Sequence, residues 1–84
     1  MSWFVYILEC NDGTLYTGIT NDITKRIAKH NSGKGAKYTE VRLPVKLKIK
    51  FQANDRSEAS KLEYKIKQLS RHEKLKLIED DKNT

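Results

Sequence analysis

This chain contains five polar residues, spread from position 6 to position 63, whose side chains could take part in chemistry. They are Tyr6, Tyr16, Arg26, His30 and Glu63. Arginine binds phosphate through its planar set of donors, and one carboxylate with several water ligands suits Mg²⁺. Cations close to a phenol favour the phenolate, which can accept a proton. Cleavage of a phosphodiester needs such groups, because negative charge builds up on the phosphate oxygens. These residue types therefore suit phosphodiester chemistry.

The same five residues also have ordinary structural explanations. Tyrosine in a strand usually fills one face of a sheet, Arg26 can pair with an acid, and His30 can lie at the surface or near a helix end. Glu63 and Lys67 have the four-residue spacing of a helical ion pair, which stabilises a helix by about 0.2–0.5 kcal/mol. The residues alone leave both explanations open, so the elements that carry them matter.

The N-terminal segment is expected to form a hairpin. Residues 3–8 are apolar on both alternating faces, as in a central strand covered on both sides. Residues 15–19 are expected to form the second strand, joined to the first by the turn signal Asn11-Asp12-Gly13.

The length of that turn decides where the tyrosines point. A two-residue turn places Tyr6 and Tyr16 on opposite faces of the sheet, whereas a three-residue loop makes them diagonal neighbours on one face. We predict the three-residue loop because Gly13 stands where φ must be positive. Tyr6 then lies opposite Gly18, whose missing side chain is expected to leave open space beside the two hydroxyls.

One helix and a third strand are expected in the middle of the chain. Asn21 or Asp22 can cap a helix that runs to about Ser32. After a basic loop that reaches Pro44, residues 45–51 alternate between apolar residues and lysines, which predicts a half-buried strand. The apolar residues expected on its buried face are Val45, Leu47, Ile49 and Phe51.

The C-terminal part is expected to form two helices. Ser57 can cap the first, whose Ala59, Leu62, Ile66 and Leu69 have helical spacing. The segment Ser70-Arg71-His72-Glu73 has the pattern of a capping box, so a second helix should begin there and carry Leu75 and Ile78 inward. The order strand, strand, helix, strand, helix, helix predicts a small α+β domain built on three strands.

The 84-residue length supports one domain, expected at residues 1–79, followed by a flexible acidic tail at 80–84. Such a domain buries roughly 60–65% of the surface that its unfolded chain exposes, so an open surface cleft is expected rather than an enclosed site. The one cysteine, Cys10, rules out an internal disulfide. No segment has the length of a membrane helix, and we expect no membrane partner and a cytoplasmic location.

The charge is strongly positive and unevenly distributed. There are 17 Lys and Arg residues against 11 Asp and Glu residues, a net charge of +6. Between residues 24 and 50 there are nine basic residues, and the single acid is Glu40. Such a field attracts polyanions, which favours nucleic acid as the partner over a merely solubilising surface.

The motifs in this chain resemble those of the GIY-YIG nuclease domain. Tyr6 stands in "VYI" where the family has its first triplet, and Tyr16 stands in "YTG" where it has its second. Arg26, His30 and Glu63 follow in family-like order and spacing. The resemblance covers about residues 3–78 and is closest to small stand-alone members. Both triplets are degenerate here, but the tyrosines and the final glycine remain.

This resemblance implies a nuclease that cuts phosphodiester bonds on a three-stranded antiparallel sheet flanked by helices. Tyr16 matches the proposed general base, with Tyr6 beside it to assist or position. Arg26 matches the arginine that holds the scissile phosphate, His30 a polar position of the same helix, and Glu63 the carboxylate that binds one Mg²⁺ or Mn²⁺ ion.

Two classes of function follow: a DNA endonuclease, or a non-catalytic nucleic-acid-binding module that retains the site. RNA or branched nucleic acid are alternative substrates, and a partner protein or a homo-oligomer would supply further DNA contacts. Tyr38 can contact substrate or simply anchor its loop. The residues expected to contact nucleic acid are Gly18, Lys25, Lys29, Lys34, Lys37 and Tyr38.

Overall fold

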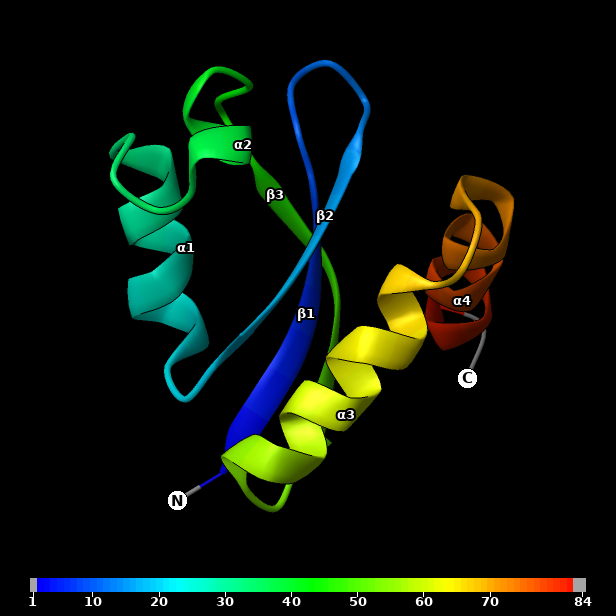
Figure 1. The fold of residues 1–84 in the computed structure, drawn as a ribbon. Helices are drawn as coiled ribbons and strands as arrows, with labels where there is room; N and C mark the ends of the chain where they lie inside the picture. The colour runs from blue at the N-terminus through cyan, green and yellow to red at the C-terminus, as the bar shows by residue number, and fades with distance from the viewer. Residues whose placement is uncertain (1, 83–84) are drawn as a thin grey trace.

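A three-stranded antiparallel sheet forms the centre of the protein in the computed structural model, which describes residues 2–82. The strand order is β2-β1-β3, so β2 is an edge strand. In Figure 1, α1 and α2 lie to one side of β2, and α3 and α4 lie to the other. The α+β class and the antiparallel sheet are therefore confirmed. In chain order the elements are β1 (Trp3–Glu9), β2 (Leu15–Thr20), α1 (Ile23–Asn31), α2 (Lys37–Glu40), β3 (Lys46–Ala53), α3 (Arg56–Lys67) and α4 (Arg71–Lys82).

The central strand β1 contributes to a core on each face of the sheet, because successive side chains of a strand point to opposite sides. Val5 and Ile7 face α3 and α4 and pack in one cluster with Ile66 and Ile78. Tyr6 and Leu8 face the other way and pack in a second cluster. The partly buried residues packed against that second cluster are Tyr16, Ile23, Ile27 and Leu43.

The hairpin has the predicted three-residue loop. Tyr6 pairs with Gly18, and Leu8 pairs with Tyr16. The amide of Cys10 donates to the carbonyl of Thr14 at 2.8 Å. Gly13 has a φ of +83°, a conformation that costs little without a Cβ. The two tyrosines therefore lie on one face, as predicted.

The prediction for the third strand is wrong in one respect. Ile7 pairs with Ile49, but Leu8 pairs with Leu47, so the register shifts by one residue between them. A bulge of this kind turns the following side chains to the other face of the sheet. Ile49 therefore belongs to the core under α3, Val45 belongs to the core under α1, and Leu47 is 37% exposed.

The helix caps partly follow the predictions. Asp22 caps α1 and accepts from the amide of Lys25 at 3.1 Å, as expected. The cap of α3 is Asp55, not Ser57, and its carboxylate accepts from the amide of Glu58 at 2.8 Å. Both residue types are good caps, and the end of β3 at Ala53 places Asp55 at the first turn.

The predicted capping box begins α4. Ser70 Oγ accepts from the amide of Glu73 at 3.2 Å, and the Glu73 carboxylate accepts from the amide of Ser70 at 2.9 Å. Ile78 is buried as expected, but Leu75 is 38% exposed, so its inward assignment is wrong. The helix continues to Lys82, so the described part of the segment predicted to be a tail is helical, while residues 83–84 lie outside the described range. None of the helices in residues 2–82 is both long and apolar enough to cross a membrane.

Exchange of Asp55 for alanine tests the cap of α3. We expect Asp55→Ala to lower the free energy of unfolding by about 1 kcal/mol, because the Glu58 amide loses its acceptor. Ser57→Ala is the matched control and should change it by less than about 0.5 kcal/mol. Urea unfolding at pH 7 measures both. A larger loss in Ser57→Ala than in Asp55→Ala would contradict the assignment.

Candidate active site

The hairpin and α1 bring four of the predicted residues together. The register of β1 and β2 places the rings of Tyr6 and Tyr16 with centroids 6.5 Å apart. Arg26 and His30 are four residues apart, so both project from one face of α1. That face meets the tyrosines: the His30 ring lies 6.0 Å from the Tyr6 ring and 5.3 Å from the Tyr16 ring.

A chain of buried hydrogen bonds runs from Tyr6 to α2. The Tyr6 hydroxyl lies 3.0 Å from Nε2 of His30, and Nδ1 of His30 lies 2.8 Å from Oγ1 of Thr39. The Thr39 hydroxyl donates to the carbonyl of Ala36 at 3.0 Å. A threonine hydroxyl has a single proton, so it must accept from Nδ1–H of His30. Nε2 is then the acceptor, and Tyr6 donates to it.

The Tyr6 oxygen also accepts a hydrogen bond. Nε of Arg26 donates to it at 3.3 Å. This bond is the main cause that raises the pKa of Arg26, and it outweighs the opposite effect of burial. The guanidinium therefore stays charged. A guanidinium has five N–H donors, so Arg26 can hold Tyr6 and a phosphate at the same time.

Burial keeps Tyr6 and His30 neutral. Desolvation is the main cause that lowers the pKa of His30 to about 4, and the charge of Arg26 acts in the same direction. Desolvation also raises the pKa of Tyr6, an effect that outweighs the hydrogen bond from Arg26. Tyr6 therefore stays a protonated phenol and has no phenolate that could accept a proton. It serves instead as a fixed hydrogen-bonding group.

Two glycines make room for this pair. A Cβ on Gly18 would lie 2.5 Å from the Tyr6 hydroxyl, and a Cβ on Gly35 would lie 2.5 Å from Nδ1 of His30. Both distances are shorter than atoms can tolerate. The space at Gly18 is thus filled by the Tyr6 ring and is not open as expected. Gly18 is buried, and it serves the packing of the two tyrosines.

Tyr16 differs from Tyr6 because it is only partly buried. Its ring stacks on Tyr38, with centroids 6.0 Å apart and planes at 26°. The guanidinium of Arg42 lies 4.0 Å from the centre of the Tyr38 ring, and its Nε donates to the Asp12 carboxylate at 3.1 Å. The hairpin turn and the loop after α1 are thus joined beside Tyr16. Tyr16 combines a fixed ring with access to solvent.

Glu63 lies on α3, which packs against β1 and β2. Burial is the main cause that raises the pKa of Tyr6, and the negative charge of Glu63 adds a smaller effect in the same direction. The carboxylate is 22% exposed, and its Oε2 lies 3.5 Å from Nζ of Lys67. The ordinary i,i+4 ion pair is therefore present, and it is compatible with a role at the site.

The donor set restricts the metal that the site can hold. Within residues 2–82, no three His, Cys, Asp or Glu side chains gather in one group. A closed zinc site needs four protein ligands. Mg²⁺ is commonly bound through one or two carboxylates together with water and substrate phosphates. Glu63 fits an ion of the second kind.

Four of the predicted nucleic-acid contacts are lysines on α1 or in the segment that follows it. Lys25 and Lys29 are exposed on α1, and Lys34 and Lys37 are exposed beyond its C-terminus. Tyr38 is 40% exposed and stacked on Tyr16, so it both anchors its loop and presents an aromatic surface. His30 is fully buried, which excludes the surface role that the sequence left open.

Sequence reasoning missed Gly35 and Thr39. The loop after α1 was expected to be irregular, but residues 37–40 form α2, and Thr39 is fully buried against His30. Two glycines within three residues, Gly33 and Gly35, were a signal for close backbone approach. Nothing in the sequence pairs Thr39 with a histidine nine residues earlier.

The pKa of His30 predicts a pH dependence of stability. An unfolded histidine has a pKa near 6.5, whereas folded His30 takes up a proton only near pH 4. Between these values the unfolded state binds more protons, so stability should fall as the pH is lowered from 6.5 to 4, by up to about 3 kcal/mol. Urea unfolding from pH 7.5 to 4.5 measures this. His30→Gln should lose that slope and His72→Gln should keep it; equal slopes in both variants would refute the prediction.

Comparisons with known proteins agree with this geometry. The family model of the GIY-YIG catalytic domain matches residues 2–76. A UPF0213 protein of Staphylococcus epidermidis is 53% identical over 77 residues, which cover 92% of this chain and 94% of that protein. A UPF0213 protein of Desulfotalea psychrophila is 59% identical over 78 residues, which cover 92% of this chain and 71% of that protein.

Two solution NMR structures are similar in fold. One is that of a UPF0213 protein from Bacillus halodurans, with a TM-score of 0.60 and 49% identity over 94% of this chain and 84% of that one. The other is a protein from E. faecalis, with a TM-score of 0.61 and 38% identity over 92% of this chain and 83% of that one. By its matched residues, its fold and its paired tyrosines, this protein belongs to the GIY-YIG catalytic domain family.

Proposed function

We propose that this protein is a metal-dependent endonuclease that hydrolyses phosphodiester bonds in DNA. In this proposal Tyr16 is the general base, Arg26 holds the phosphate, and Glu63 binds a divalent ion. Tyr6 and His30 position these groups. The observation that supports it best is the unequal environment of the two tyrosines, since one is buried in a neutral hydrogen-bonded chain and the other is partly exposed.

That difference assigns separate tasks to the two phenols. Tyr6 donates to His30 and accepts from Arg26, so its proton and its lone pair are both in use. Tyr16 lies beside it, with ring centroids 6.5 Å apart, and it is partly exposed to solvent. Tyr16 is therefore the group that takes a proton from the attacking water.

Arg26 is held in place for the phosphate. Its bond to Tyr6 fixes the guanidinium between α1 and the sheet, where fixed donors stabilise charge that develops on the phosphate oxygens. A divalent ion bound by Glu63 supplies a Lewis acid when it is present. The exposed lysines around the site raise the local concentration of a polyanion.

Exchange of Tyr16 for phenylalanine tests the assignment of the base. Tyr16→Phe should reduce metal-dependent cleavage by about 100-fold or more, which is the usual contribution of a general base. The ring and its stack on Tyr38 remain, so stability and DNA affinity should be almost unchanged. Cleavage of labelled single-stranded, duplex and branched DNA and RNA, with Mg²⁺ or Mn²⁺, measures the activity. Full activity in this variant would remove Tyr16 from the mechanism.

Exchange of Glu63 for glutamine tests the metal ligand. Glu63→Gln should abolish metal-dependent cleavage and weaken the binding of Mn²⁺ measured by calorimetry, because a carboxamide is a poor ligand for these ions. DNA affinity without metal should not fall. Glu58→Gln, a change on the same helix, is the matched control. Normal Mn²⁺ binding by Glu63→Gln would sink the assignment.

The alternative is a nucleic-acid-binding module that retains the site without catalysis. The cleavage assay distinguishes the module from the endonuclease. Salt-sensitive binding with no cutting under any metal condition favours the module. Cutting that both Tyr16→Phe and Glu63→Gln abolish favours the enzyme.

A further inference from the structure

A groove follows the outer edge of β2 next to Tyr16. A cavity of about 260 Å³ is lined by β2, by α2 and by the two C-terminal helices. A neighbouring cavity of about 210 Å³ shares Leu15 and Lys74 with it and continues to Thr14 and Arg71. We refer to the two cavities together as the β2-edge groove. The residues that line it are Thr14, Leu15, Tyr16, Thr17, Tyr38, Lys67, Arg71 and Lys74.

The lining of this groove is cationic. Lys67 comes from the end of α3, and Arg71 and Lys74 come from the first turn of α4, so three positive charges face the groove from two helices. None of the lining residues is acidic. Lys67 is 52% exposed, so its contact with Glu63 leaves it able to reach a ligand. Nη1 of Arg71 donates to the carbonyl of Gly13 at 2.6 Å, which holds its guanidinium at the far end of the groove.

A buried polar atom also points to a ligand. Thr17 is 4% exposed and lines the larger cavity, and its Oγ1 has no hydrogen-bond partner within residues 2–82. Burial of an unpaired hydroxyl is unfavourable. A phosphate or sugar oxygen in the cavity would pair with it.

We propose that the β2-edge groove binds an unpaired nucleic-acid strand beside the phosphate that Arg26 holds. This inference rests on the proposed nuclease function. Lys67 and Lys74 contact successive phosphates, and Thr17 donates to the backbone. The groove follows the edge of β2 and carries three cations, so it suits the charged backbone of one strand.

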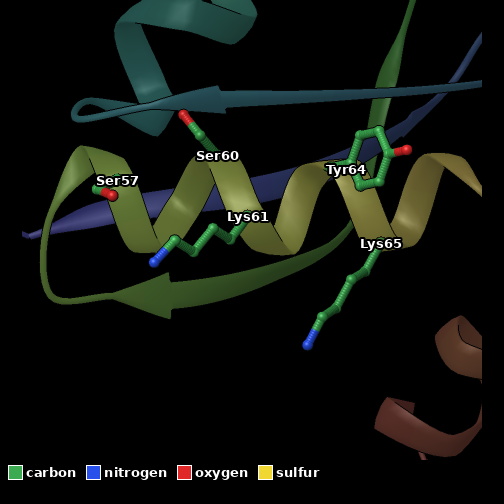
Figure 2. A pocket seen from close by; sticks show the side chains of 5 residues that line it. All are labelled: Ser57, Ser60, Lys61, Tyr64 and Lys65. Carbon is green, nitrogen blue, oxygen red and sulfur yellow. The ribbon is translucent and has the colours of Figure 1, made fainter.

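A matched pair of double variants tests this placement. Lys67→Gln/Lys74→Gln removes two charges from the groove. Lys65→Gln/Lys76→Gln removes two charges from the same helices, but these lysines line other cavities. Figure 2 shows Lys65 projecting from α3 away from β2, beside a cavity of about 480 Å³ with Lys61 and Tyr64. Both variants have the same net charge, so long-range attraction is equal.

Binding of a labelled 16-nucleotide single strand, of the blunt duplex and of the duplex with an unpaired overhang is measured in EDTA at several salt concentrations. Each phosphate contact with a single strand adds about 0.7 to the slope of log affinity against log salt concentration. Loss of two such contacts in the groove variant should therefore weaken binding of the single strand and the overhang about 25-fold at 0.1 M salt. The control variant should show only the small loss that the lower net charge causes, and that loss should be the same for all three substrates.

Thr17→Val provides a second variant that does not change charge. Loss of the unpaired hydroxyl should raise the melting temperature, while affinity for the single strand falls severalfold. A purely structural role for Thr17 would leave affinity unchanged, and that result would remove the hydroxyl from the site.

Equal losses in both double variants, no loss in either, or an equal loss for the blunt duplex would each overturn the groove proposal. Normal single-strand binding by the groove variant, together with cleavage that Tyr16→Phe abolishes, would refute the groove alone and leave the nuclease proposal standing. No binding to any oligonucleotide would refute both.

Discussion

The buried hydrogen bond between the Tyr6 hydroxyl and Nε2 of His30 is the contact around which the site is organised. It joins the central strand to α1, and through Thr39 it extends to α2. Buried polar groups are stable only when every donor and acceptor has a partner. Tyr6, His30 and Thr39 each donate one hydrogen bond and accept one, which leaves one arrangement of protons and one orientation of each ring. The neighbouring positions of Arg26 and Tyr16 follow from that fixed arrangement.

The edge position of β2 explains how a domain of this size has a site that substrate can reach. An enclosed cavity would need more surrounding structure than 84 residues supply. Here α1, which carries Arg26, lies on one side of β2, and α3, which carries Glu63, lies on the other, while Tyr16 is on β2 itself. The site therefore lies at the sheet edge, where the larger cavity of the β2-edge groove borders Tyr16.

Electrostatics divides this small site into two parts. Inside, desolvation keeps Tyr6 and His30 neutral, while Arg26 stays charged beside them. Outside, exposed lysines lie on α1 and α3, and three cations line the β2-edge groove. The neutral interior positions the reactive groups, and the cationic exterior attracts a polyanion.

Local sequence signals determined the strands of the hairpin, the three-residue loop at Gly13, the Asp22 cap and the capping box of α4, because each depends on residues within a few positions of one another. They also identified four polar positions that the structure brings together on β1, β2 and α1, and Glu63 near them on α3. Tertiary structure alone decided the bulge that turns Val45 and Leu47 to the sheet face opposite Ile49, the choice of Asp55 over Ser57, and the partners of His30. Those features depend on the packing of segments that are distant in the chain, and no local pattern of residues records which distant group will fill a given space.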